Sequence, residues 1–169
     1  MANNYHGKTI LGELMDNVTV SSSASTDSTA AVYVGKETGG NLWVEVYAGD
    51  TAVVMENTDT LGFYLQSDDA GTLADCEAPV SHDNAGGKVG ATGTFAHEET
   101  NEIAADAATY GLSITAGSGT VTFAAGDLIA EIGIPDTMMR LCGHTYINLK
   151  TIETGDPTGT IDAFVVARI

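Results

Sequence analysis

The chain has 169 residues, enough for one domain with a sizeable hydrophobic core. Its 23 acidic residues greatly outnumber its 6 lysines and arginines, and the formal net charge is −17 at pH 7. A surface this acidic repels nucleic-acid phosphates and anionic lipids, so we expect neither nucleic acid nor membrane as a partner. No apolar run approaches the roughly 18 residues that span a bilayer, and the first residues lack the pattern of a secretory signal. We therefore expect a cytoplasmic protein.

The N-terminal segment differs in character from the rest of the chain. Residues 1–10 are expected to form either an extended arm, which could add a strand to the sheet edge of a partner, or a disordered tail. Residues 11–169 are expected to form a single domain. Within it, the serine-rich stretch SSSASTDST at 21–29 is interpreted as a polar turn or an exposed connector.

Apolar residues recur at every second position through most of the domain, which indicates half-buried β-strands. In NLWVEVYAG (41–49), Trp43, Glu45 and Tyr47 lie opposite three aliphatic residues, and in LGFYLQSDD (61–69), Tyr64 lies opposite Leu61, Phe63 and Leu65. In residues 126–135 the set Leu128, Ala130, Ile132 and Ile134 is assigned to one buried face. The same period predicts further strands within residues 28–35, 50–56, 111–116, 119–126, 144–151 and 159–169.

Two stretches do not follow this period. Residues 97–111 (HEETNEIAADAATYG) are rich in alanine with acids in the first turn, which is typical of a short helix, although a long loop is the alternative. Residues 75–94 are rich in glycine and are interpreted as an excursion between strands. Eight or nine short strands without alternating helices predict an all-β, antiparallel sandwich or barrel.

Catalytic and metal-binding motifs are not found. The sequence His97-Glu98-Glu99-Thr100-Asn101 lacks the second histidine of a zinc-protease motif, and the glycines near Lys88 do not have phosphate-loop spacing. The acidic cluster at Asp68, Asp69 and Asp75 begins with adjacent residues, whose carboxylates leave a strand on opposite sides. We interpret this cluster as a solvated loop at a strand end, with a weak calcium site as the alternative. We expect no enzyme activity and no cofactor.

Three segments, in this order, resemble the capsid cement (decoration) proteins of tailed bacteriophages, the family of the podovirus cement proteins. They are LMDNVTVSSSASTDSTAAVYVG, LGFYLQSDDAGTL and GDLIAEIGIPDTMMRLCGHTYINLKTIETGDPTGTIDAFVVARI. The resemblance implies a jelly-roll sandwich of about eight strands that forms a homodimer or homotrimer. It also implies binding to neighbouring subunits of the major capsid protein on the outside of the head, without catalytic residues. Localisation on the virion, after assembly in the host cytoplasm, follows from the same resemblance.

Candidate interface residues are aromatic, methionine and arginine side chains, because these types are favoured at interface centres. Those that lie out of phase with the core are Trp43, Tyr47, Tyr64, Tyr146 and Phe164, and the others are Tyr5, Met138, Met139 and Arg140. Two other functions remain open. A carbohydrate-binding β-sandwich of tail or adhesin type would use Trp43, Tyr47 and the acidic loops, and a β-fold hydrolase would use histidines such as His97 or His144.

Overall fold

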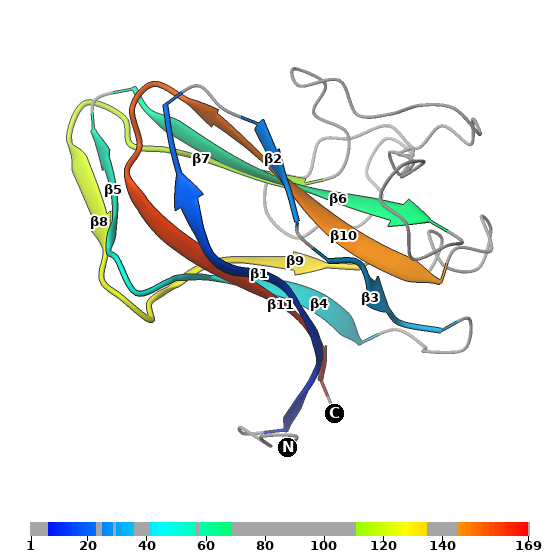
Figure 1. Cartoon of the computed structure of the whole chain (residues 1–169). Helices are drawn as coiled ribbons and strands as arrows, with labels where there is room; N and C mark the ends of the chain where they lie inside the picture. Colours follow the sequence, from blue (N-terminus) through cyan, green and yellow to red (C-terminus); the bar gives the residue numbers. More distant parts are fainter. Residues whose placement is uncertain are drawn as a thin grey trace.

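Within the part that the structure describes, all the regular secondary structure is β-strand, and the strands pair antiparallel (Figure 1). This computed structural model describes residues 7–22, 25–28, 30–35, 41–56, 58–68, 111–134 and 145–168, and these ranges contain no helix. The eleven strands are β1 (Lys8–Val20), β2 (Ser25–Asp27), β3 (Val32–Tyr33), β4 (Leu42–Ala48), β5 (Val53–Glu56), β6 (Thr60–Asp68), β7 (Gly111–Thr115), β8 (Thr120–Phe123), β9 (Leu128–Gly133), β10 (Tyr146–Thr154) and β11 (Gly159–Arg168). The prediction of an all-β, antiparallel fold is confirmed.

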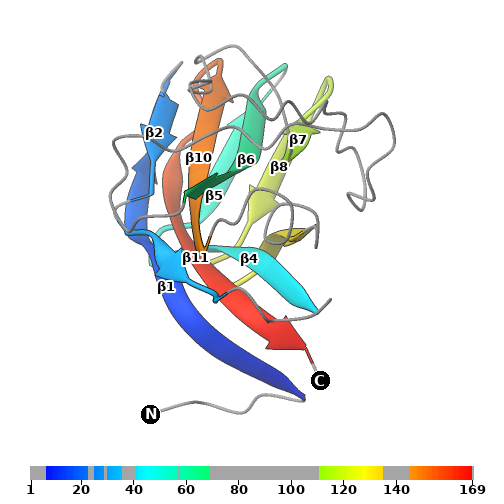
Figure 2. The same cartoon turned by 90° about the vertical axis from the view of Figure 1, so that its right-hand side faces the viewer.

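Two larger sheets and one small sheet make up the fold. One sheet has the strand order β1-β11-β4-β9, and the other has the order β2-β10-β6-β7 with β3 paired to β10. Strands β5 and β8 form a separate two-stranded sheet. Figures 1 and 2 show the two larger sheets as layers that face each other, as in a β-sandwich.

The core lies between these layers and follows the alternation in the sequence. Leu61, Phe63 and Leu65 of β6 are fully buried, and so are Val44 and Val46 of β4. The facing strands add further buried aliphatic residues, including Ile147, Leu149, Ile161, Ala163 and Val165. Since successive side chains of a strand point to opposite faces, Trp43, Glu45 and Tyr47 are directed away from the core.

Strands β1 and β2 are the two elements that the sequence reasoning did not predict, and the described residues contain eleven strands where eight or nine were expected. Residues 8–10 of the expected arm are the first residues of β1, where Lys8 pairs with Arg168. Register shifts between Ile10 and Gly12, and twice more before Val18, interrupt the alternation of β1. The expected polar connector at 21–29 contains β2, which pairs with β10.

The assignment of Leu128 to the buried face was wrong. The register between β4 and β9 shifts at Val46 and Tyr47, so Ile129 is an extra residue between the pairs Val46–Ala130 and Tyr47–Leu128. Such a bulge interrupts the alternation, so residues on its two sides no longer keep the same phase. Ile129 and Ala130 are therefore both buried, while Leu128 is 42% exposed.

The expected helix or loop near residues 97–110 and the excursion at 75–94 lie outside the described residues. So do residues 1–6 of the expected arm.

Candidate functional site

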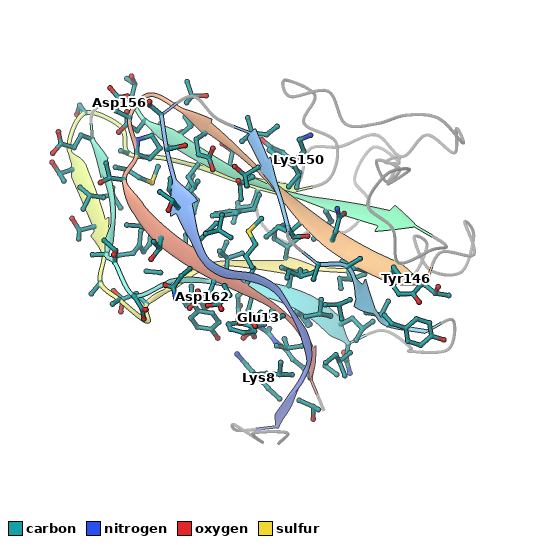
Figure 3. The ribbon with its side chains drawn as sticks, in the orientation of Figure 1. Lys8, Glu13, Tyr146, Lys150, Asp156 and Asp162 are labelled. Carbon is teal, nitrogen blue, oxygen red and sulfur yellow. The ribbon has the colours of Figure 1, made fainter. Side chains whose placement is uncertain are left out.

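The outer surface of the four-stranded sheet gathers most of the chemically distinctive side chains that the structure describes. We call it the open face and define it by the outward-pointing residues of its two central strands together with their neighbours on β1 and β9. The residues of the central strands are Trp43, Glu45, Tyr47, Asp162, Phe164, Val166 and Arg168. In the register of β4 and β11, Glu45 is paired with Phe164 and Tyr47 with Asp162. Figure 3 shows Lys8, Glu13 and Asp162 on the side of β1 and β11 that faces away from the five-stranded sheet.

Glu45 is the centre of a charged network on this face. Its Oε1 lies 2.6 Å from the Lys8 ammonium and 2.8 Å from the Arg168 guanidinium. Its Oε2 accepts a 2.6 Å hydrogen bond from the Tyr47 hydroxyl. The carboxylate is thus held by three donors from three strands, and its side chain is only 3% exposed although it points out of the core.

Glu131 of β9 lies directly opposite Glu45, an arrangement of like charges that is unfavourable on a sheet surface. The Arg168 guanidinium forms an ion pair with Glu131 as well as with Glu45. Lys8 lies 3.8 Å from Glu131. Two cations therefore neutralise two carboxylates and link the strands β1, β4, β9 and β11.

The network shifts the ionisation of its members. Burial alone would raise the pKa of Glu45, but the hydrogen bonds from Lys8, Tyr47 and Arg168 outweigh it and lower the pKa. Burial and the hydrogen bond to the Glu45 carboxylate raise the pKa of Tyr47. Glu45 is therefore ionised and Tyr47 neutral at neutral pH.

Aromatic rings flank the network. The Arg168 guanidinium lies over the Trp43 ring, 4.2 Å from its centroid, in a cation–π contact. The same ring extends over Gly133 of β9, where any side chain would meet it. Tyr47 and Phe164 form an edge-to-face pair with centroids 6.2 Å apart.

A groove of about 300 Å³ runs along this face. Tyr47, Phe164, Val166 and Ile10 give it an apolar lining. The Lys8–Glu45 ion pair also lines the groove, and Asp162 adds a further carboxylate. Ile10 is 42% exposed, so the groove carries apolar surface that is open to solvent.

The structure brings together three of the nine predicted interface residues, namely Trp43, Tyr47 and Phe164. Tyr64 and Tyr146 lie on the outer surface of the other large sheet, where the Tyr64 ring covers Gly62 and Tyr146 packs edge-to-face on Tyr33 with centroids 5.2 Å apart. The remaining four, Tyr5, Met138, Met139 and Arg140, lie outside the described residues.

Sequence reasoning did not identify the cations of the open face or Tyr33. Arg168 could have been found, because it shares the phase of Phe164 on the last strand. Lys8 gives no such signal, since the sequence around it is interpreted as an arm. Tyr33, which is 61% exposed, belongs to a two-residue strand with too few positions to show a period.

Other kinds of site find no support among the described residues. No group of three or more histidine, cysteine, aspartate or glutamate side chains is placed to hold a metal ion there. Nor do those residues include a helix that is long and apolar enough to cross a membrane. Asp68 is the last residue of β6, whereas Asp69, Asp75, all four histidines and both cysteines lie outside the described ranges.

Comparison of the chain with protein-family models, curated proteins and solved structures finds no match.

Proposed function

We propose that the two large sheets form a jelly roll built from eight of the strands. If β3, β5 and β8 are set aside, the first of the remaining strands pairs with the last (β1 with β11) and the second with the seventh (β2 with β10). The third pairs with the sixth (β4 with β9) and the fourth with the fifth (β6 with β7). This pairing is what results when a chain folds once in half and then wraps into two sheets, as jelly rolls do.

We further propose that the protein is a structural component of a phage virion. It binds the outer face of the capsid, bridges neighbouring subunits of the major capsid protein and so stabilises the mature, expanded shell. The observation that carries this proposal is the open face, where a tyrosine and a phenylalanine line a groove. The same face holds an arginine that stacks on a tryptophan and binds Glu45 of the groove lining. These residue types dominate the binding energy of protein interfaces.

The network around Glu45 supports a binding role in a second way. Because Glu45 holds Lys8, Tyr47 and Arg168 together, these side chains have little conformational freedom left to lose on binding. A partner thus meets a surface that is already ordered.

The overall charge is consistent with a position outside the capsid. Packaged DNA lies within the shell, and a protein with a net charge of −17 has no electrostatic attraction to it. A protein that binds only the expanded lattice stabilises that lattice by mass action, since binding adds free energy to one state alone.

Carbohydrate binding is the second candidate, and the geometry of Trp43 supports it less well. A sugar stacks on the face of an aromatic ring, but the Arg168 guanidinium occupies one face of the Trp43 ring and the ring lies over Gly133. Glycan-array binding and a calcium-dependent rise in melting temperature are the results expected for that alternative.

The test is to add the purified chain to expanded and to unexpanded shells, assembled from the major capsid protein that the same genome encodes. Sedimentation measures binding, and heating measures shell stability. The proposal predicts binding to expanded shells only, together with a higher temperature of shell disruption. Failure to bind either kind of shell would contradict it. Sedimentation equilibrium of the free protein tests the associated expectation of a homodimer or homotrimer.

A further inference from the structure

We propose that the groove of the open face receives a lysine or arginine flanked by an apolar residue, presented by a segment of the partner protein. The identity of this partner as the major capsid protein rests on the proposed function. The chemistry of the bound segment follows from the groove itself. Two properties define that chemistry: the distribution of charge along the groove and the nature of its lining.

Charge is balanced at only one end of the groove. At the end formed by Lys8 and Glu45, two cations neutralise two carboxylates. Asp162 lines the other end, and the carboxylates of Asp162 and Asp16 are close enough to Glu13 of β1 to interact with it electrostatically. Within the described residues no lysine or arginine forms a salt bridge with any of these three carboxylates. Figure 3 shows Glu13 and Asp162 close to each other on β1 and β11. This end of the groove therefore carries negative charge without a counterion from the described part of the chain.

These carboxylates repel one another. Partial desolvation, together with the neighbouring charges of Asp16 and Asp162, raises the pKa of Glu13. Asp162 also accepts a 2.7 Å hydrogen bond from the backbone N–H of Asn17, which fixes its carboxylate at the groove. A cation from a partner would relieve this repulsion.

The lining between the two ends is apolar. Tyr47, Phe164, Val166 and Ile10 offer the surface on which an aliphatic or aromatic side chain would be buried. An ion alone would leave this surface exposed, and an apolar ligand alone would leave the carboxylates without a counterion. A segment that carries both groups satisfies both requirements, because the stem of a lysine or arginine packs along apolar surface while its charge reaches an anion.

The test uses the full chain, labelled with ¹⁵N, and two capped tripeptides, acetyl-Leu-Lys-Leu-amide and its Leu-Glu-Leu analogue. The lysine peptide is expected to shift the amide resonances of Tyr47, Asp162 and Phe164 in a saturable way, whereas the glutamate peptide leaves them unchanged. The double variant E13Q/D162N removes two charges and keeps the acceptor that Asn17 uses. This variant is expected to bind the lysine peptide with an affinity about 3- to 10-fold lower than that of the wild type.

The matched control is E56Q/D156N, which removes two exposed carboxylates. Figure 3 shows Asp156 far from Lys8, Glu13 and Asp162, and Glu56 lies near Asp156 because the backbone N–H groups of both residues donate to the Asp59 carboxylate. This control is expected to bind the lysine peptide as the wild type does. Equal shifts with both peptides, or equal weakening in both double variants, would overturn the inference.

Shell binding separates this inference from the proposed function. Peptide binding without shell binding would contradict the capsid proposal and leave the groove as a site for basic segments of another protein. Shell binding that E13Q/D162N does not weaken, with no saturable peptide shifts, would overturn the inference and leave the capsid proposal standing.

Discussion

Two buried glutamates of this protein sit in opposite electrostatic environments. Glu45 is surrounded by the hydrogen-bond donors of Lys8, Tyr47 and Arg168, which lower its pKa. Glu153 of β10 points between the sheets, is 4% exposed, and its Oε2 has no hydrogen-bond partner among the described residues. Burial raises the pKa of Glu153, and hydrogen bonds from Thr151 and the backbone offset this only in part. The two residues should therefore affect stability with opposite dependence on pH.

Replacement of Glu45 by glutamine is expected to lower the free energy of unfolding by about 1–2 kcal/mol at pH 7, because the two cations lose their shared carboxylate. The folded-state pKa of Glu45 lies below its ordinary value of 4.5, so the stabilisation is complete above that pH and is lost as the pH falls through the folded-state pKa. Urea denaturation of wild type and E45Q between pH 3 and pH 7 measures this difference. A difference that stays constant down to pH 3 would contradict the account.

Replacement of Glu153 by glutamine is expected to raise stability at pH 7 by about 1 kcal/mol, because it removes a charge from the core. The folded-state pKa lies above 4.5, so the penalty is absent below the unfolded-state pKa and grows as the pH rises through the folded-state value. The advantage of E153Q should therefore appear only as the pH increases. The same series of urea denaturations measures the difference in the free energy of unfolding between E153Q and wild type. If E153Q is less stable than wild type at pH 7, the ionised carboxylate does not destabilise the fold.

At the scale of elements, the sheets depend on close approaches that only glycine allows. Gly159 begins β11 with a φ of 118°, and a Cβ there would lie 2.3 Å from the backbone oxygen of Ala52. Thr158, the preceding residue, bridges to Val54 of β5. At Gly159 the start of β11 therefore lies against the backbone of Ala52, just before β5. These backbone atoms cannot move aside for an added Cβ as a flexible side chain could.

The variant G159A is expected to lose about 3 kcal/mol or more of stability, because it combines an unfavourable φ with a backbone clash. G117A is the matched control, since Gly117 has a φ of 71° and a Cβ added there would meet no atom of the described residues within 4 Å. The control should lose only about 1 kcal/mol, the cost of the left-handed conformation alone. Equal losses in urea denaturation would show that the close approach to Ala52 is unimportant.

The regular strands could be predicted from sequence together with the faces of their side chains, whereas the irregular ones were missed or assigned in part to the wrong face. In β4, β6, β10 and β11 a period of two residues reports directly which side chains face the core. In β1 and β9 the bulges break that period, which is why β1 was missed and Leu128 was misassigned. Because β4 and β11 keep the period, Trp43, Tyr47 and Phe164 could be named as outward-facing.

The charged network could not be predicted at all, because strand pairing brings its members together from distant parts of the chain. Arg168 and Glu45 are 123 residues apart in sequence. No local pattern links them.

At the scale of the whole molecule, the two large sheets present different outer surfaces. The open face carries the groove, the charged network and three aromatic rings. The other carries the Tyr33–Tyr146 pair and Tyr64. Figure 2 shows the first residues of β1 and the last residues of β11 running side by side toward the same edge, so the open face continues to the margin of the molecule.

If the open face binds the capsid, the variant F164A should bind expanded shells about 10-fold more weakly, because it removes an aromatic anchor from the lining of the groove. Y33A removes an exposed ring from the other sheet and should bind within about twofold of wild type. Sedimentation of shells with increasing protein gives both affinities. The opposite ranking would place the interface on the five-stranded sheet.

The most direct measurement is the orientation of the protein in a cryo-electron microscopy map of expanded shells incubated with the full chain. We expect density for the sandwich on the outer surface, with β1, β11, β4 and β9 facing the major capsid protein and the Tyr47–Phe164 groove occupied by one of its segments. A map with the β2-β10-β6-β7 sheet against the shell, or with no added density, would contradict it.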